Sequence, residues 1–310
     1  MSAPRVESIA CSSPAGIHRM AYYDWGDRDN RDILLCVHGL TRNGRDFDMV
    51  AQRLSKRYRV ICPDVVGRGL SDWLPNPAGY QVPQYAADII ALLGRLQPSS
   101  LNWLGTSMGG LIAMVYCGLV AKAARGKAPT PPARLKATIP NPIVPINRLI
   151  LNDVGPRVEP SSLLRIGAYL SEVKEFDDYP SAVAYLRETS ASFGLKTDEQ
   201  WDMFARHYFA QKDGKWIKHY DPSIAGGFVG MTPEAMAKGE QYLWGVFDAI
   251  AAPTLVLHGT ESDLLSAESV SRMVSGNANA RSVEIAGVGH APSLMVSHEI
   301  DLIEQFLSEA

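Results

Sequence analysis

The feature that most constrains the fold is a serine held between two glycines, where an apolar run meets a helical pattern. The residues Gly-Thr-Ser-Met-Gly at 105–109 follow the strand-like run 101–104 and precede the helix-like run 111–115. A chain that turns this sharply from strand to helix keeps the serine on a strained backbone and exposes its hydroxyl. The glycines are required because side chains there would clash with the neighbouring strand and helix. The pattern predicts a nucleophile elbow at Ser107.

The rest of the chain places this elbow in a mostly parallel sheet. Short β-rich runs alternate with helical patterns, which is typical of such a sheet covered by helices. The strand-like runs are 33–37, 58–62, 101–104, 148–153, 254–258 and 282–285, and the helical patterns between and after them are 47–54, 85–96, 111–115, 269–274 and 300–307.

The middle of the chain lacks this alternation. From about Pro156 to Gly245 the strand signal disappears and helical patterns take over. We therefore expect a core domain formed by 1–155 and 246–310, and an inserted helical cap or lid formed by 156–245. Open α/β sheets bind ligands at the carboxyl ends of their strands, so an insertion there is expected to cover the site. The proline-rich stretch 121–145 is predicted to be a loop, because proline at this density cannot continue a helix or a central strand.

Composition excludes several classes of function. The 310 residues carry a net charge of -3, with lysines and arginines scattered singly, so no basic surface is predicted for nucleic acid. Residues 1–10 lack the apolar region of a secretory signal, and no uncharged apolar stretch is as long as a membrane span. We expect a cytoplasmic protein that binds neither nucleic acid nor membrane; the sequence does not fix its oligomeric state.

The four cysteines give no sign of a metal site. Cys11, Cys36, Cys62 and Cys117 lack close-spaced pairing, and the chain has neither C-x-x-C nor H-E-x-x-H. Buried free thiols in a reducing compartment are the simplest interpretation. The sequence therefore predicts no metal and no cofactor.

Serine is a poor nucleophile at neutral pH, so it needs a base and a group that orients that base. His290, in the glycine-rich segment 287–292, is the predicted general base. Asp263 lies in the loop after the strand-like run 254–258 and is predicted to bond the imidazole. The order Ser107, Asp263, His290 is the one expected for a serine triad on a strand-to-helix elbow.

Other acids compete for the same role. Asp153 also ends a strand at the expected catalytic edge, and Glu261 lies two residues before Asp263. Asp64 lies in the glycine-rich stretch 64–72 and is predicted instead to hold that turn together by bonds to backbone amides. The choice between Asp263 and Asp153 stays open to test.

Acyl transfer also needs donors for the negative charge that develops on the carbonyl oxygen. The backbone amide of Met108 is one candidate. The second is the amide of Leu40, in the loop His38-Gly39-Leu40 that follows the strand-like run 33–37. The His38 ring is expected to be structural or to border the substrate.

Together these motifs resemble the α/β-hydrolase superfamily over nearly the whole chain, and the match is closest to its lidded branch of bacterial carboxylesterases, lactonases and carbon-carbon bond hydrolases. The resemblance implies a mostly parallel eight-stranded sheet with helices on both faces and an inserted helical cap. A serine at the elbow disfavours the dehalogenase and epoxide hydrolase branches, whose covalent step uses a carboxylate. The stretch 121–145 departs from the compact family pattern.

The resemblance implies a serine hydrolase that cleaves carboxylic esters of small molecules, with short hydroxyacid oligoesters as a candidate substrate class. A carbon-carbon bond hydrolase of aromatic catabolism and a non-catalytic ligand receptor on the same fold are the alternatives. Ligand sites are predominantly apolar with few polar anchors. The predicted substrate-binding residues are His38, Arg42, Trp201, Phe228 and Met231.

Overall fold

The computed structural model describes residues 3–125, 143–170, 172–228 and 232–309. Its main sheet has eight strands in the order β1-β2-β4-β3-β5-β6-β10-β11. These strands are β1 (Arg5–Ser13), β2 (Gly16–Trp25), β3 (Asp32–Val37), β4 (Arg59–Pro63), β5 (Ser100–Thr106), β6 (Ile146–Asn152), β10 (Thr254–Gly259) and β11 (Ala280–Ile285). The predicted eight-stranded sheet is confirmed.

The sheet is antiparallel at one edge and parallel over the rest. β1 pairs with β2, and β2 with β4, in antiparallel register. All pairs from β4 through β3, β5, β6 and β10 to β11 are parallel. The carboxyl ends of β5, β6 and β10 therefore lie side by side at one edge, which is where an open parallel sheet places its ligands.

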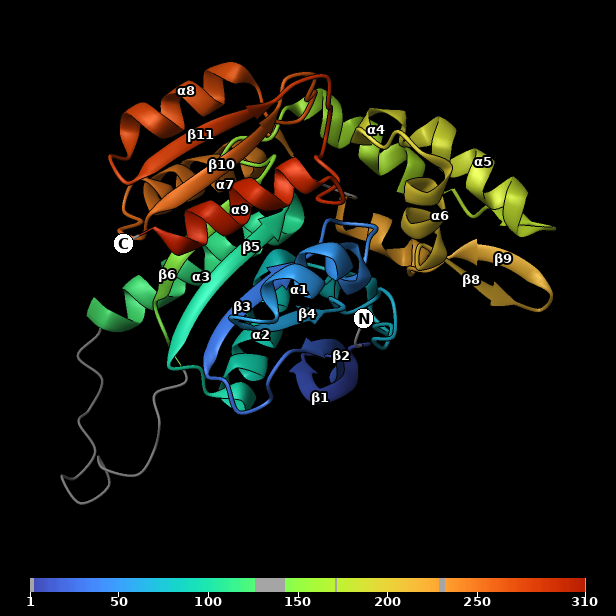
Figure 1. The fold of residues 1–310 in the computed structure, drawn as a ribbon, viewed down its shortest axis with the longest axis horizontal. Helices are drawn as coiled ribbons and strands as arrows, with labels where there is room; N and C mark the ends of the chain where they lie inside the picture. The colour runs from blue at the N-terminus through green and yellow to red at the C-terminus, as the bar shows by residue number, and fades with distance from the viewer. Residues whose placement is uncertain (1–2, 126–142, 171, 229–231, 310) are drawn as a thin grey trace.

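Helices cover both faces of this sheet (Figure 1). α1 (Asp48–Leu54) and α9 (Ser297–Ser308) pack on one face, with Leu34 and Cys36 of β3 beneath them. α2 (Val82–Leu96), α3 (Met108–Arg125) and α8 (Ala267–Gly276) pack on the other, where β3 presents Ile33, Leu35 and Val37. β3 thus alternates its apolar side chains between two cores, as expected of a strand buried on both faces.

A separate block of elements connects β6 to α7. It contains α4 (Pro160–Leu170), β7 (Glu175–Phe176), α5 (Tyr179–Thr189), η4 (Ala191–Phe193), α6 (Asp198–Arg206), β8 (Phe209–Lys212), β9 (Lys215–Lys218) and η5 (Pro222–Phe228). The helices α4, α5 and α6 lie beside the main sheet, with the β8–β9 hairpin at the far end (Figure 1). The small sheet β7-β9-β8 was not predicted.

The end of this block differs from the expected boundary at 245. α7 (Pro233–Phe247) packs against α3, since a Cβ on Gly118 of α3 would lie 2.5 Å from Tyr242 Oη. Figure 1 likewise draws α7 behind β10 and away from α5 and α6. The helical block that projects from the sheet therefore ends before α7.

The elbow helix extends further than expected. α3 continues through residues 121–125, which the proline-rich pattern predicted to be loop, and residues 126–142 of that stretch lie outside the described part of the chain. In the described ranges α3 is the one helix that by length and composition alone could cross a membrane. It packs against β5, α2 and α7.

Candidate active site

Ser107 lies at the turn between β5 and α3, on a strained backbone. Its φ of 52° is in the left-handed region of backbone conformation that residues other than glycine rarely adopt. A Cβ on Gly105 would lie 2.5 Å from the backbone of Gly109, and one on Gly109 would lie 1.9 Å from the Val37 carbonyl oxygen. Both flanking glycines are therefore required sterically. The local geometry is that of the expected elbow.

His290 faces Ser107 from the loop that follows β11. Its Nε2 lies 2.9 Å from Ser107 Oγ, and its Nδ1 lies 2.7 Å from Asp153 Oδ2. An ionised carboxylate only accepts hydrogen bonds, so Nδ1 carries a proton and, in the neutral ring, Nε2 is left to accept from the serine hydroxyl. The geometry lets His290 accept the proton of Ser107 while Asp153 holds the ring in that orientation.

The prediction that Asp263 bonds the imidazole is wrong. Asp263 points to solvent, where its half-exposed carboxylate pairs with Arg165 at 2.5 Å. The bond to His290 is made by Asp153, the alternative left open by the sequence. The physical reason is the strand order: β6, which ends at Asn152, is the direct neighbour of β5, whereas β10 lies one strand further away.

Asp153 is fully buried and held by several bonds. Its Oδ1 accepts from the amide of Gly259 at 2.9 Å, and its Oδ2 accepts from Ser262 Oγ at 2.5 Å as well as from His290. Ser262 Oγ in turn accepts from the amides of Leu264 and Leu265. The loop after β10 thus contributes Ser262 to the acid, while its neighbour Asp263 faces outward.

The loop after β3 approaches the elbow. A Cβ on Gly39 would lie 3.7 Å from the Cβ of Ser107. The two candidate amides are those of Leu40 and Met108, the residues that directly follow Gly39 and Ser107. Within the ranges that the structure covers, neither amide donates to another protein group. Two free amides beside the serine are what a developing oxyanion requires.

His38 does not border a substrate, contrary to one of the expectations. It is fully buried, its Nε2 accepts from the Val65 amide at 2.9 Å, and its Nδ1 donates to the Gly39 carbonyl at 2.6 Å. Burial lowers the pKa of His38 to about 3, so the ring is neutral. The Gly39 carbonyl belongs to the same peptide as the Leu40 amide, and His38 therefore fixes the direction of that amide.

Arg68 is a further residue of this region that the sequence did not single out. It is fully buried, and its Nε donates to the Leu40 carbonyl at 2.8 Å. Its Nη2 lies 3.7 Å from the Met108 sulfur, and its Nη1 donates to Tyr85 Oη at 3.0 Å. One guanidinium thus contacts both residues whose amides flank Ser107. Its position in the glycine-rich turn 64–72 is the sequence feature that could have identified it.

The turn that carries Arg68 is organised by Asp64, as predicted. The Asp64 carboxylate accepts from the amides of Gly44 and Leu70, each at 2.7 Å. Burial raises the pKa of Asp64 to about 6, although these amides act in the opposite direction. Asp64 is thus a structural carboxylate.

The remaining predicted substrate residues are distributed differently. Arg42 binds Asp46 and stacks 3.5 Å from the centre of the Phe204 ring, with its Nη2 donating to the Phe204 carbonyl at 3.1 Å. Trp201 is buried against Phe204 in the helical block. Arg42 therefore joins the loop after β3 to α6. The Phe228 side chain and all of Met231 lie outside the described part of the structure.

Bonding geometry, and not cavity size, identifies this site. One cavity of about 320 Å³ lies between α1 and α6 and is lined by Met49, Met203 and Met295, among others. Another, of about 580 Å³, lies between the ends of α3 and α7. Ser107 lines neither of them.

Comparisons with known proteins agree with this architecture. The model of the alpha/beta hydrolase family matches residues 34–304. A 3-hydroxybutyrate-oligomer hydrolase from Cupriavidus necator is 45% identical, covering 100% of this chain and 99% of that protein. The crystal structure of a putative hydrolase from Rickettsia typhi is 33% identical with a TM-score of 0.82 and 99% coverage of both chains. An alpha/beta hydrolase from Novosphingobium aromaticivorans is 34% identical with a TM-score of 0.79 and the same coverage. The chain belongs to the alpha/beta hydrolase family.

Proposed function

We propose that the protein hydrolyses carboxylic esters through an acyl-enzyme on Ser107. The observation that carries the proposal is the unbroken path from Ser107 Oγ to His290 Nε2 at 2.9 Å and from His290 Nδ1 to Asp153 at 2.7 Å. A hydroxyl hydrogen-bonded to a base, which is itself bonded to a buried carboxylate, is the arrangement that activates serine.

The reaction follows from the positions of these groups. Ser107 Oγ attacks the ester carbonyl while His290 Nε2 takes its proton, and the amides of Leu40 and Met108 stabilise the oxyanion. His290 then protonates the leaving alcohol, and water repeats the sequence on the acyl-enzyme. Asp153 keeps the Nδ1 proton in place and stabilises the imidazolium. Loss of one oxyanion donor typically costs about 2.7–4 kcal/mol of transition-state stabilisation.

The proposed substrates are short oligoesters of hydroxyacids. The support is the relative from Cupriavidus necator, which is named for hydrolysis of 3-hydroxybutyrate oligomers and matches the chain from end to end. Such a substrate has a free carboxylate at one end. Arg42 Nη1 is buried and has no partner in the described ranges, and we assign it to that acidic end.

The helical block from α4 to η5 is proposed to act as a cap over Ser107. Two contacts support this role: Arg42 bonds the Phe204 carbonyl, and the Gly289 amide, next to His290, donates to the Ser192 carbonyl at 2.7 Å. We expect the protein in the cytoplasm. Its four free cysteines, three of them buried, agree with a reducing compartment.

The test is hydrolysis of the 3-hydroxybutyrate trimer and of p-nitrophenyl esters from acetate to dodecanoate. We expect turnover that disappears in Ser107→Ala and persists in the control Ser275→Ala, an exposed serine of α8. A fluorophosphonate probe should label the wild type and the control but not Ser107→Ala. A folded protein with no ester turnover would contradict the proposal; activity on a vinylogous diketone would then indicate carbon-carbon bond hydrolysis.

A further inference from the structure

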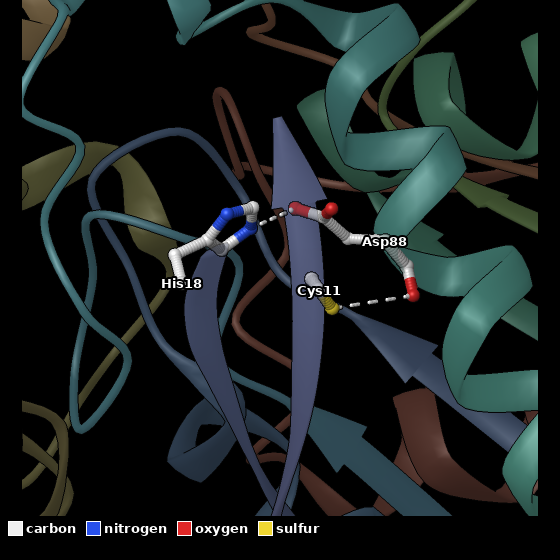
Figure 2. A group of neighbouring side chains, drawn as sticks. All are labelled: Cys11, His18 and Asp88. Carbon is white, nitrogen blue, oxygen red and sulfur yellow. Dashed lines mark hydrogen bonds and ion pairs between the residues drawn. The ribbon is translucent and has the colours of Figure 1, made fainter. Parts of the chain in front are cut away.

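A second group of reactive side chains lies at the antiparallel edge of the sheet, three strands away from β5. Cys11 of β1 and His18 of β2 are directly opposite each other in the antiparallel register, so both side chains lie on one face of the hairpin. α2 packs over that face and contributes Asp88. Figure 2 shows the three side chains converging, and we refer to them as the hairpin cluster.

The cluster is compact and buried. His18 Nε2 lies 3.0 Å from Asp88 Oδ2, and Cys11 Sγ lies 4.0 Å from the Asp88 carbonyl oxygen. One thiol, one imidazole and one carboxylate atom all lie within 4.8 Å of one another. The exposed fractions are 4% for Cys11, 4% for His18 and 1% for Asp88.

Packing alone gives a poor account of these residues. An imidazole and a carboxylate lose their hydration when they are buried, and a single hydrogen bond does not fully compensate for it. His18 Nδ1 has no partner among the described residues, so one bond alone holds the ring. Cys11 is the fully buried side chain of β1, and it makes only a weak sulfur contact.

The cluster is also not a second nucleophilic site. Burial, reinforced by the nearby Asp88 carboxylate, raises the pKa of Cys11 to about 12, so the thiol keeps its proton in the protein as described. No direct hydrogen bond joins the thiol to the imidazole within the described residues; each of them contacts Asp88 instead. A nucleophilic cysteine must be a thiolate before it reacts, whereas a metal ion displaces the thiol proton as it binds.

Thiolate, imidazole and carboxylate are the three protein ligands that Zn²⁺ takes, at about 2.0–2.3 Å from the metal. Tetrahedral geometry at those distances separates ligand atoms by about 3.3–3.8 Å. The His18 Nε2–Asp88 Oδ2 pair, at 3.0 Å, needs to open by about 0.3 Å, and Cys11 Sγ needs to approach by about 1 Å. Side-chain rotations supply both movements. A softer ion such as Cu⁺ prefers the thiolate, and a harder ion such as Mg²⁺ prefers the carboxylate, so neither uses all three ligands well.

Gln84 is placed as an outer support for such a site. Its Nε2 donates to Asp88 Oδ1 at 2.8 Å and to the Ser12 carbonyl at 2.9 Å. The other carboxylate oxygen, Oδ2, is the one that faces His18. Metal-binding carboxylates are commonly oriented in this way, with one oxygen on the ion and the other on a neighbouring donor.

We propose that Cys11, His18 and Asp88 bind one divalent transition-metal ion, with Zn²⁺ the best match and water as the fourth ligand. Coordination replaces the His18–Asp88 hydrogen bond, and the thiol proton passes to solvent. The ion would join the β1–β2 hairpin to α2. The exposed turn 14–16, between the two strands, gives the ion a short route to the cluster.

The test is Co²⁺ titration of the full-length protein after treatment with a chelator. We expect one equivalent per chain, with a thiolate-to-cobalt charge-transfer band that Zn²⁺ abolishes, and a Tm that rises with metal concentration. Cys11→Ser should lose the band. The matched control Cys117→Ser removes a half-buried thiol outside the cluster and should keep it. Gln84→Ala should weaken binding by about 10- to 100-fold.

The proposal is overturned if the wild type shows no thiolate band, or if Cys11→Ser keeps the band with unchanged affinity. Circular dichroism and the Tm of metal-free Cys11→Ser establish that the variant is folded. A further variant, His18→Gln, removes a buried ring and can fail to fold. In that case Cys11→Ser and Gln84→Ala still decide the outcome, because both keep the buried imidazole. Ester turnover is not used as a readout, so failure here is distinct from failure of the proposed hydrolase activity.

Discussion

At the scale of single residues, the acid beside His290 shows how position on a strand decides a role. Asp153 directly follows β6, has a φ of 54°, and is fully buried. Asp263 lies four residues beyond the end of β10 and faces solvent. Two carboxylates that look equivalent in the sequence therefore differ in their burial and in their distance from the imidazole.

Substitution of each acid should separate them. Asp153→Asn is expected to lower kcat/KM by on the order of 10³–10⁴, because an amide cannot hold the Nδ1 proton as a carboxylate does. Asp263→Asn should stay close to the wild type, since it removes only an exposed ion pair with Arg165. Steady-state kinetics on one ester substrate measures both, and the reverse ranking would return the role to Asp263.

The sequence identified Ser107 and His290, but it favoured Asp263 over Asp153 as the acid, for a physical reason. Ser107 and His290 sit in glycine-rich segments whose spacing constrains the backbone. The acid needs no such backbone; it needs only to end a strand near the serine. Which strand lies next to β5 is a property of the sheet order, and the sequence does not contain that order in readable form.

At the scale of elements, two neighbouring residues of the loop after β3, Arg42 and Asn43, attach α6 to the core. Arg42 stacks on Phe204 and donates to the Phe204 carbonyl, and Asn43 Nδ2 donates to the His207 carbonyl at 2.6 Å. Hydrogen bonds to charged groups contribute about 1.5–3 kcal/mol. The position of α6 over the loop after β3 depends on these contacts.

Arg42→Lys should loosen α6 without unfolding the protein. Lysine keeps the charge but loses the planar stacking and the geometry of the bond to Phe204, so amide hydrogen exchange in 198–206 is expected to rise by about 10-fold, equivalent to about 1.4 kcal/mol. Arg53→Lys, whose partners Asp301 and Glu304 lie on α9, is the control and should leave exchange in α6 unchanged. Equal exchange in both variants would refute the link.

The β8–β9 hairpin and the helix α7 were not identified from the sequence. The β8–β9 hairpin turns at Asp213-Gly214, whose φ values of 51° and 78° indicate a type I′ turn. Asp-Gly is a strong hairpin signal and was available in the sequence. The helix α7 was not singled out in the sequence, and most of its residues were grouped with the cap by the expected boundary at 245, because the sequence does not reveal which neighbour a helix packs against.

At the scale of the whole molecule, buried neutral histidines couple stability to pH. Burial lowers the pKa of His38 to about 3 and that of His207 to about 4, and it also lowers that of His219. The unfolded chain binds these protons near pH 6.5, so the free energy of unfolding falls as the pH drops below that value. Asp64 acts oppositely, since its raised pKa of about 6 makes the folded state bind a proton first.

Replacing His38 isolates its contribution to the pH dependence of the free energy of unfolding. Urea unfolding of the wild type and of His38→Gln between pH 7 and 4.5 should show a difference in stability that narrows as the pH falls, by up to about 1.4 kcal/mol for each pH unit below about 6. Glutamine can accept from the Val65 amide and donate to the Gly39 carbonyl, so the fold is retained. A difference independent of pH would mean that the pKa of His38 is the same in the folded and unfolded states.

The overall architecture was the most predictable level. The alternation of strand and helix patterns predicted a mostly parallel sheet, and its six strand-like runs correspond to β3, β4, β5, β6, β10 and β11. The full number of eight strands came from the resemblance to the family. The antiparallel hairpin of β1 and β2 was not located. In β1 only Cys11 is buried, and half-exposed and exposed residues alternate over most of its length. Packing between distant segments, such as α7 on α3, is decided by the whole core.

The bond from the Gly289 amide to the Ser192 carbonyl connects movement of the helical block to the position of the base. It fastens the helical block to the residue that precedes the imidazole. A displacement of η4 that breaks this bond also releases the backbone beside His290. A substrate could then pass the block only while His290 is out of alignment with Ser107. The protein would be inactive while the block is open and active only after the block has closed.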